Sequence, residues 1–397
     1  MNKLLITRVD GRILTVLTED SRAIQMEYEE EEASLLGNIY IGKVKNIVKN
    51  INSAFVEIGK GQMAYYSLSD NKVHHFAVSQ ERKELREGDE ILVQVARDAV
   101  KTKDPVVTAN LSFTGHLCVL TAGKNQISFS SKIRSQEWKD QMKALLEPEK
   151  EDEFGIIVRT NAAEAEPEAV IGELRQLKIQ YHQILENGAH RTCYSKLYEA
   201  YPSYINRIRD TYITSMEEIV TDDKEIYGQL KQYLHENQPE DENRLRFYED
   251  AMLPLAKLYQ IDKAMEEALS THVWLKSGGY LVIEPTEAMT VIDVNTGKNT
   301  DKKTASETYL KTNLEAAEEI AVQLRLRNLS GIIVVDFIDM KEKAQNEELM
   351  RRLRQCLAAD PVKTVLVDMT PLGLVEITRK KTLRPLHEQF SRSEKNR

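Results

Sequence analysis

The chain has 397 residues, 41% of them apolar, which is enough for two to four domains with hydrophobic cores. Its net charge of −9 and pI of about 5.6 disfavour a nucleic-acid partner, because phosphate binding favours basic surfaces. They do not exclude one, because an acidic total can hide a local basic groove. The three cysteines, Cys118, Cys193 and Cys356, have no disulfide or zinc-site spacing, and no apolar run reaches the roughly 18 residues of a membrane span. We therefore expect a protein of the reducing cytoplasm.

The pattern of the N-terminal third of the chain predicts two separate β-structures. Residues 1–35 predict a meander that is too short to be a domain and completes a sheet built elsewhere. Residues 36–113 contain about five short strands with glycine turns, the pattern of a small closed barrel of the OB type. Phe55 and Tyr65 fall on these strands and Lys103 on a loop beside them, a combination that forms stacking platforms for single-stranded RNA. The alternative is that Phe55 belongs to the core and Tyr65 is incidental.

Residues 114–204 combine strands with helices. A charged amphipathic helix is predicted over 135–146 and a longer one over 164–198. Between them an apolar strand ends in Arg159 and Thr160. A planar guanidinium and a hydroxyl suit a phosphate, although an arginine at this position is also commonly a surface salt-bridge partner.

Residues 205–270 show little chemistry in their pattern. We expect a strand over 207–213, a short helix over 226–234 and a further helix over 258–269. Asp222 and Asp223 stand at a strand end, where they could form a metal pair, although a solvated turn is the commoner arrangement of such residues.

Residues 271–390 predict an α/β domain that begins with a hairpin of strands over 279–284 and 290–295. Side chains alternate between the two faces of a strand. Asp293 and Asn295 therefore emerge side by side on one face.

The same domain continues with alternating helices and strands. A long helix is expected over 308–328, and the uninterrupted apolar run at 331–337 indicates a fully buried strand. Another helix over 346–359 and a third strand over 364–368 follow. In layered α/β domains ligands bind at the carboxyl ends of strands, and residues 391–397 add a basic tail.

Two apolar strands of this domain end in aspartates, Asp293 and Asp336. Magnesium binds oxygen ligands, and one or two carboxylates with a substrate phosphate are enough to hold it. Asn295 could then donate to the phosphate or orient the attacking water, while Lys298 and Lys302 could steady the backbone nearby. The competing interpretation is that each aspartate caps the helix or turn that follows it.

Several stretches resemble the ribonuclease E/G family of endoribonucleases, across nearly the whole chain. They are GNIYIGKV at 37–44, SAFVEIG at 53–59, GIIVRTNA at 155–162, TVIDVNTG at 290–297, GIIVVDFIDM at 331–340 and GLVEITRK at 373–380. The two motifs that contain Asp293 and Asp336 are together highly specific, whereas the barrel motifs alone would be weak.

The resemblance implies a multidomain α+β and α/β fold. Residues 1–35 and 205–270 would form one split RNase H-like domain, into which an OB-fold barrel (36–113) and a 5′-sensor region (114–204) are inserted. Residues 271–390 would form a DNase I-like catalytic domain.

The resemblance also implies three groups of functional residues. The groups are a catalytic Mg²⁺ site at Asp293 and Asp336 assisted by Asn295, a 5′-monophosphate sensor at Arg159 and Thr160, and an RNA clamp of Phe55, Tyr65 and Lys103. Within the clamp, Tyr65 stands where family members carry phenylalanine, a change that keeps an aromatic ring for stacking.

The sequence departs from the family in one respect. Known members continue past the Thr-Arg-Lys of residues 378–380 into a CPxC motif, whose cysteines from two chains share one zinc ion. No cysteine follows Cys356 here. We therefore expect no zinc site, and any homo-oligomer would form without a cysteine zinc link.

Three functions are compatible with these residues. The first is a magnesium-dependent endoribonuclease that cuts single-stranded, AU-rich RNA with a 5′-monophosphate in rRNA processing or mRNA turnover. The second is a non-catalytic RNA-binding factor, for example in ribosome assembly, that keeps the fold. The third, a metal-dependent phosphatase acting on a small substrate, is disfavoured by the barrel with Phe55, Tyr65 and Lys103.

Overall fold

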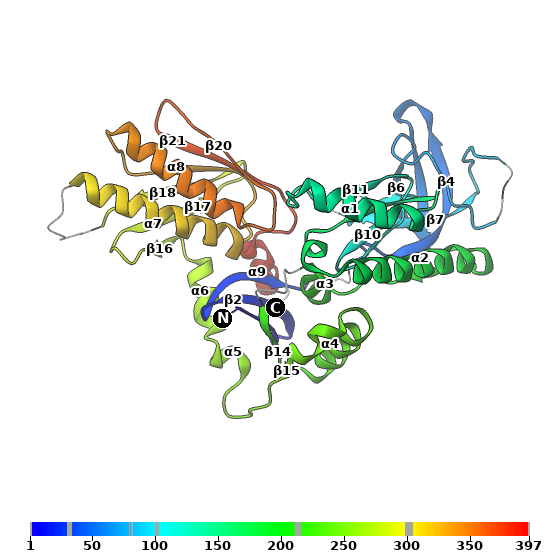
Figure 1. Cartoon of the computed structure of the whole chain (residues 1–397), viewed down its shortest axis with the longest axis horizontal. Coiled ribbons are helices and arrows are strands. Elements are labelled where there is room, and N and C mark those ends of the chain that lie inside the picture. The colour runs from blue at the N-terminus through cyan, green and yellow to red at the C-terminus, as the bar shows by residue number, and fades with distance from the viewer. Residues whose placement is uncertain are drawn as a thin grey trace. The chain divides into compact units, whose positions relative to one another are not determined.

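The computed structural model describes residues 2–29, 34–78, 80, 82–99, 103–210, 216–297 and 305–395. The chain divides into two compact units (Figure 1). One comprises Met1–Glu30, Ile213–Lys231 and Asn243–Arg397, and the other Glu31–Tyr212 and Gln232–Glu242. No described helix is long and apolar enough to cross a membrane.

The first N-terminal strand pairs with a strand from much later in the chain. Together the early and late strands form a five-stranded sheet in the order β15-β14-β1-β2-β3, in which β1 runs parallel to β14 and antiparallel to β2. The meander thus completes a sheet built elsewhere, while the RNase H-like designation stays a prediction. The strands are β1 (Asn2–Val9), β2 (Arg12–Glu19), β3 (Arg22–Tyr28), β14 (Met216–Thr221) and β15 (Leu245–Phe247).

Helices cover this sheet through apolar side chains. Ile261 and Met265 of α6 (Ile261–Leu269) and Leu386 of α9 (Leu386–Lys395) pack with strand residues such as Leu5 and Val16 in one buried cluster. The short helix α5 (Leu255–Leu258) joins the same cluster, and α4 (Lys224–Asn237) follows β14.

The second unit contains the predicted closed barrel. Five strands, in the order β4-β5-β6-β8-β7, form a closed barrel because β4 also pairs with β7. Strand β13 pairs antiparallel with β4. The barrel interior is filled by residues such as Val56, Ala64 and Tyr66. The strands are β4 (Ile39–Val48), β5 (Ser53–Gly59), β6 (Gln62–Ser67), β7 (Glu90–Arg97), β8 (Val106–Thr108) and β13 (Lys196–Tyr198).

A four-stranded sheet and three helices follow the barrel. The sheet has the order β11-β12-β10-β9. Its strands are β9 (Ser112–Thr114), β10 (Cys118–Ala122), β11 (Ile127–Phe129) and β12 (Phe154–Val158), and the helices are α1 (Gln136–Leu146), α2 (Pro167–His190) and α3 (Ser203–Asp210). Helix α1 confirms the helix predicted over 135–146. The Ser135 side chain caps this helix by accepting a hydrogen bond from the amide of Trp138.

Two predictions for this unit were wrong in part. The helix expected over 164–198 ends at His190, and β13 lies within the same range. The strand expected over 207–213 overlaps α3, and residues 211–213 lie outside the described residues. Tyr204, Ile205 and Ile208 bury one face of α3, a helical spacing that the apparent alternation of the sequence conceals.

The C-terminal part of the first unit is a six-stranded mixed sheet with two long helices. The strand order is β16-β17-β18-β19-β21-β20. The strands are β16 (His272–Trp274), β17 (Tyr280–Pro285), β18 (Met289–Asn295), β19 (Gly331–Asp336), β20 (Thr364–Met369) and β21 (Leu374–Arg379), and the helices are α7 (Ala305–Leu326) and α8 (Lys343–Ala358). The predicted hairpin, helices and third strand are all present.

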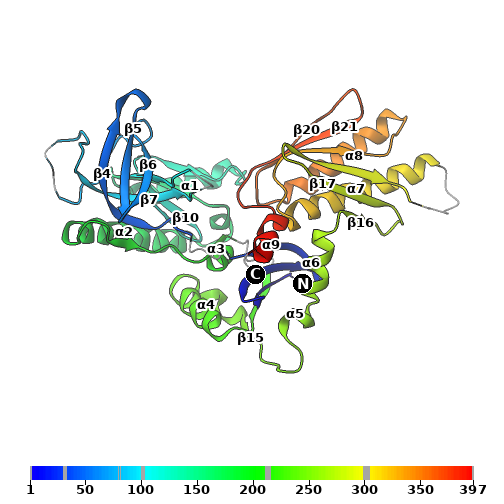
Figure 2. The same cartoon turned by 180° about the vertical axis from the view of Figure 1, so that it is seen from behind.

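One face of this sheet is covered and the other is open. Ile292 and Ile333 pack in one core with Leu324 of α7 and Leu353 of α8, and the two helices lie along the sheet (Figures 1 and 2). The prediction of a fully buried strand at 331–337 was wrong, because Ile332 on the uncovered face is 50% exposed. The open face is where the candidate site lies.

Candidate active site

Asp293 and Asp336 meet on the open face of the C-terminal sheet. Strands β18 and β19 run parallel, and their register places Asp293 directly beside Asp336. Neighbouring strands lie about 4.8 Å apart, so the two side chains leave adjacent positions of one surface. Burial alternates along β18, with Thr290 and Ile292 buried and Asp293 exposed, which confirms the predicted orientation.

The electrostatics of the pair favour a cation. Partial burial, followed by the charges of Asp293 and Asp339, raises the pKa of Asp336 above the ordinary value of an aspartate. Asn295 donates from Nδ2 to Oδ2 of Asp293 over 2.7 Å. Within the described ranges, neither Asp293 nor Asp336 forms an ion pair with a basic side chain. Two carboxylates without a positive partner are the donor set of a hard divalent ion.

The set is sparse, as magnesium allows. Among the described residues no three or more His, Cys, Asp or Glu side chains are grouped so that they could enclose an ion. Magnesium is commonly held by one or two carboxylates, water and substrate phosphate, without a complete protein cage. Asp293 and Asp336 therefore fit magnesium better than an ion that needs a full set of protein ligands.

The capping interpretation finds no support at these two aspartates. In the described part of the chain neither accepts a backbone hydrogen bond, whereas Asp223 shows what a cap looks like here. Its Oδ1 accepts from the amides of Glu225 and Ile226 at the start of α4.

Asp339 is a third carboxylate that the sequence prediction missed. It lies just beyond β19, and its charge contributes to the raised pKa of Asp336. The signal was present in the motif at 331–340, where an aspartate recurs three residues after Asp336. A cation that binds the pair would also be attracted by Asp339.

Glycines permit the close packing at the end of β18. A Cβ on Gly297 would lie 2.2 Å from the carbonyl oxygen of Gly278, and one on Gly279 would lie 2.7 Å from that of Asn295. The turn between β16 and β17 therefore lies against the segment that leaves Asn295. Lys298 and Lys302 lie outside the described residues.

The proposed RNA clamp gathers on the outside of the barrel. Phe55 on β5 and Tyr65 on β6 are register partners, and their ring centroids lie 6.2 Å apart at 81°. Both alternate with buried residues, so Phe55 is not a core residue. Lys103 is exposed and lies two residues before Pro105, whose carbonyl accepts from the amide of Tyr65. Phe55 and Tyr65 therefore share one outer surface, and the segment that carries Lys103 joins the strand of Tyr65 at Pro105.

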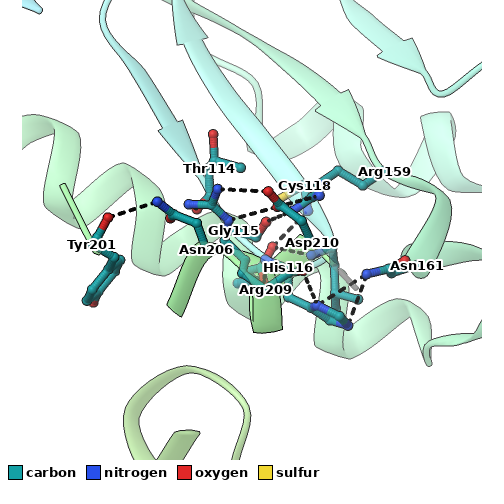
Figure 3. Close-up of polar contacts among 12 residues, drawn as sticks. Thr114, Gly115, His116, Cys118, Arg159, Asn161, Tyr201, Asn206, Arg209 and Asp210 are labelled. Carbon is teal, nitrogen blue, oxygen red and sulfur yellow. Dashed lines mark hydrogen bonds and ion pairs between the residues drawn. The ribbon is translucent and has the colours of Figure 1, made fainter. Parts of the chain in front are cut away.

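Arg159 and Thr160 have separate surroundings. Arg159 donates to the carbonyl of Gly115 over 2.6 Å and to Oδ1 of Asp210 over 2.7 Å, as Figure 3 shows. Burial opposes ionisation of Asp210, but bonds from Arg209 and Arg159 outweigh it and lower its pKa. Arg159 is thus already engaged with an anion, as the salt-bridge alternative describes.

Thr160 lines a cavity that the sequence prediction did not anticipate. The cavity has a volume of about 430 Å³, and Lys132 and Arg134 lie in its wall together with Thr160. The hydroxyl of Thr160 also exchanges a hydrogen bond with Ser130 over 2.8 Å. Two cations and a hydroxyl around one hollow suit a phosphate. The cations stand in the segment before α1, far from Thr160 in sequence, so no local pattern linked them.

Comparison with known proteins gives one family. A model described as the ribonuclease E/G family matches residues 112–382. The chain is 35% identical over 388 residues to ribonuclease G of Haemophilus influenzae, covering 95% of this chain and 78% of that one. It is 32% identical to ribonuclease G of Escherichia coli K12, with coverages of 95% and 77%. Ribonuclease E of a Nostoc species is 35% identical over 98% of this chain and 57% of its own.

Proposed function

We propose that this chain, which belongs to the ribonuclease E/G family, is an endoribonuclease that uses magnesium to cut single-stranded RNA. The observation that carries the proposal is the register of β18 and β19, which sets Asp293 beside Asp336 on an open surface. A purely RNA-binding surface would gain nothing from two adjacent carboxylates, because they repel phosphates.

Asp293 and Asp336 would hold the ion. Magnesium supplies a charge that stabilises negative charge on a phosphodiester and makes water a better nucleophile at neutral pH. Partial burial, and then the charges of Asp293 and Asp339, raise the pKa of Asp336. Its ionised form is therefore stabilised when a cation arrives.

Asn295 has two tasks in this scheme. One of its two amide hydrogens bonds to Asp293, which holds that carboxylate in a fixed orientation. A primary amide carries a second hydrogen, which can donate to a phosphate oxygen of the RNA. Asn295 thus positions a carboxylate and a substrate at once.

The barrel supports a single-stranded substrate. Phe55 and Tyr65 offer two aromatic rings on one outer surface, and exposed Lys103 supplies a positive charge beside them. Every base has a π-face, but it is accessible for stacking on a side chain only where the strand is unpaired. We therefore assign the RNA clamp to these three residues.

The cavity beside Thr160 supports a preference for a 5′-monophosphate. Lys132 and Arg134 supply the charge and Thr160 a hydroxyl, while Arg159 holds the strand end that carries Thr160 through its bonds to Gly115 and Asp210. Such an enzyme would act on RNA already cut once. It would serve rRNA processing or mRNA turnover in the cytoplasm, with AU-rich single-stranded segments as targets.

Cleavage of a defined oligonucleotide tests the proposed function. A 5′-monophosphorylated, AU-rich single strand with an internal label is incubated with the full chain and Mg²⁺, in parallel with the same sequence as a duplex and with a chelator. We expect internal cuts in the single strand with Mg²⁺ only. Tight binding without any cut would instead favour a non-catalytic RNA-binding factor.

A further inference from the structure

The open face of the C-terminal sheet carries a group of aromatic side chains next to the acidic pair. Trp274 on β16 is 71% exposed, an unusual state for the largest apolar side chain. Its ring centroid lies 5.2 Å from that of Tyr280 on β17. Tyr280 in turn stacks on His272, with centroids 5.8 Å apart and ring planes at 30°. Trp274, Tyr280 and His272 together form the aromatic group of this face.

Strand register fixes this group relative to the candidate active site. Trp274 is the partner of Tyr280, and Tyr280 is the partner of Asn295. These three residues form one row across β16, β17 and β18.

The next row belongs to the carboxylates. His272 is the partner of Val282, and Val282 is the partner of Asp293, which is itself beside Asp336. Residues directly opposite one another in a sheet share a face. The aromatic group and the carboxylates therefore lie on one continuous surface of one sheet.

The distances suit consecutive nucleotides. Trp274 stands two strands from Asn295, which corresponds to about 10 Å at the usual strand spacing. Stacked bases rise about 3.4 Å each along one strand. A phosphate held at Asp293 and Asp336 would thus place a base within the next few nucleotides over Trp274.

The exposure of Trp274 also agrees with stacking on a ligand. The tryptophan belongs to the edge strand β16. Most of its surface is open, while Tyr280 contacts it with the ring planes tilted by 52°. A ring already in contact with a neighbour loses little conformational freedom when a base covers its open surface. Base–aromatic stacking is tolerant of sequence, since all bases have a π-face.

We propose that the aromatic group is a base-stacking subsite that holds a nucleotide adjacent to the scissile phosphate, with Trp274 as the principal contact. The inference rests on the proposed function, because it takes RNA as the ligand and the carboxylate pair as the cutting site. It adds a second place, in the same sheet as the site, where the substrate is held. The subsite positions the phosphate by fixing a neighbouring base.

Tryptophan fluorescence tests this directly. The chain has two tryptophans, Trp138 and Trp274, and a Trp138→Phe change leaves Trp274 as the only reporter while keeping a ring against Phe129. Asp293→Asn is added so that the RNA is bound without being cut. The ligand is a single-stranded oligonucleotide with a fluorescent end label, so that its anisotropy reports binding independently.

Saturating RNA should quench the emission of Trp274. An abasic nucleotide at one position within about three of the cut site should abolish the quench, while abasic positions further away should not. In the wild-type background, Trp274→Ala should weaken oligonucleotide affinity about 5- to 150-fold, and Trp274→Phe should restore most of it. Val365→Ala is the matched control, because Val365 is 42% exposed on the opposite edge strand and is not aromatic.

The outcomes separate the two proposals. Saturated RNA binding with unchanged Trp274 emission would overturn the subsite and leave the endoribonuclease proposal intact. Equal losses of oligonucleotide affinity in Trp274→Ala and Val365→Ala would have the same meaning. Failure of the full chain to bind any oligonucleotide would overturn both. A Trp274→Ala variant that sediments differently without RNA, but binds RNA normally, would assign the ring to a contact between copies of this chain and would also overturn the subsite.

Discussion

Asp293 and Asp336 are direct neighbours in the parallel register of β18 and β19, although helix α7 separates them in the chain. A crossover helix that packs on one face of a sheet returns the chain to the end of the sheet where the first strand began, so that the second strand runs parallel to the first. It therefore brings two carboxylates together on the face that it leaves open. Five consequences of the described geometry can be measured.

The first prediction concerns stability. The pKa of Asp336 is raised in the folded protein by partial burial and by Asp293 and Asp339. Ionised Asp336 therefore destabilises the fold at pH values above its folded pKa, and this penalty vanishes below its unfolded pKa. In the absence of Mg²⁺, Asp336→Asn should be more stable than wild type at pH 7 by on the order of 0.5 kcal/mol, a figure reduced for solvent screening.

Urea unfolding at pH 7 and pH 3 measures this difference, with a chelator present throughout. The gain should shrink as the pH falls. Asp368→Asn is the control, since Asp368 is also exposed and lies on a strand of the same sheet. An Asp336→Asn variant that is less stable than wild type at pH 7 would contradict the prediction.

The second prediction concerns Asn295. Removing its bond to Asp293 frees that carboxylate to rotate, and groups that orient a metal ligand typically contribute 10- to 100-fold in affinity or activity. Asn295→Ala should therefore lower kcat or the apparent affinity for Mg²⁺ by about that factor, with a smaller loss of RNA affinity from the missing contact to a phosphate oxygen. Steady-state kinetics over a range of Mg²⁺ concentrations would show it, and a loss confined to KM for RNA would contradict it.

The third prediction concerns the barrel. Tyr65→Ala removes a ring that faces Phe55, and the loss of one stacking contact should weaken single-stranded RNA binding by about 1–3 kcal/mol. Tyr65→Phe removes only the hydroxyl that bonds to Ser53 over 2.6 Å, so affinity should persist. Fluorescence anisotropy with a single-stranded oligonucleotide distinguishes the two variants. Equal affinity of Tyr65→Ala and wild type would reject the clamp.

The fourth prediction concerns the cavity beside Thr160. Arg134→Ala should reduce the advantage of a 5′-monophosphate over a 5′-hydroxyl about 10- to 150-fold, because a charge-assisted hydrogen bond contributes about 1.5–3 kcal/mol. Arg159→Ala should also reduce the preference for a 5′-monophosphate, because the strand end that carries Thr160 would lose its anchor. Arg175→Ala is the control, since Arg175 pairs with Glu149 outside the cavity. If Arg134→Ala and Arg159→Ala both kept the full preference for a 5′-monophosphate, the 5′-sensor assignment would fail.

The sequence was sufficient to predict features that depend on short-range periodicity. The alternation through residues 290–295 placed Asp293 and Asn295 on one face, and the glycine-punctuated strands predicted a closed barrel. Helix α1 also followed from the amphipathic pattern of residues 135–146. These predictions need only the local period of two or 3.6 residues.

Other features depend on contacts between distant segments. The apolar run at 331–337 was assigned to a buried strand because periodicity does not reveal that helices cover only one face. Arg159 was predicted to bind phosphate, but its ion pair with Asp210 depends on how α3 packs. The cavity of Lys132, Arg134 and Thr160 likewise joins residues from separate elements.

The most direct test of the central claim, the fifth prediction, compares Asp293→Asn with Asp368→Asn in Mg²⁺-dependent cleavage of a 5′-monophosphorylated single strand. Both changes remove one negative charge from an exposed strand residue of the same sheet, and only Asp293 is the partner of Asp336. RNA affinity is measured alongside for each variant. We predict that Asp293→Asn abolishes cutting while binding RNA normally, and that Asp368→Asn cuts as wild type does. Equal cutting by Asp293→Asn and wild type would contradict the assignment of the acidic pair as the catalytic site.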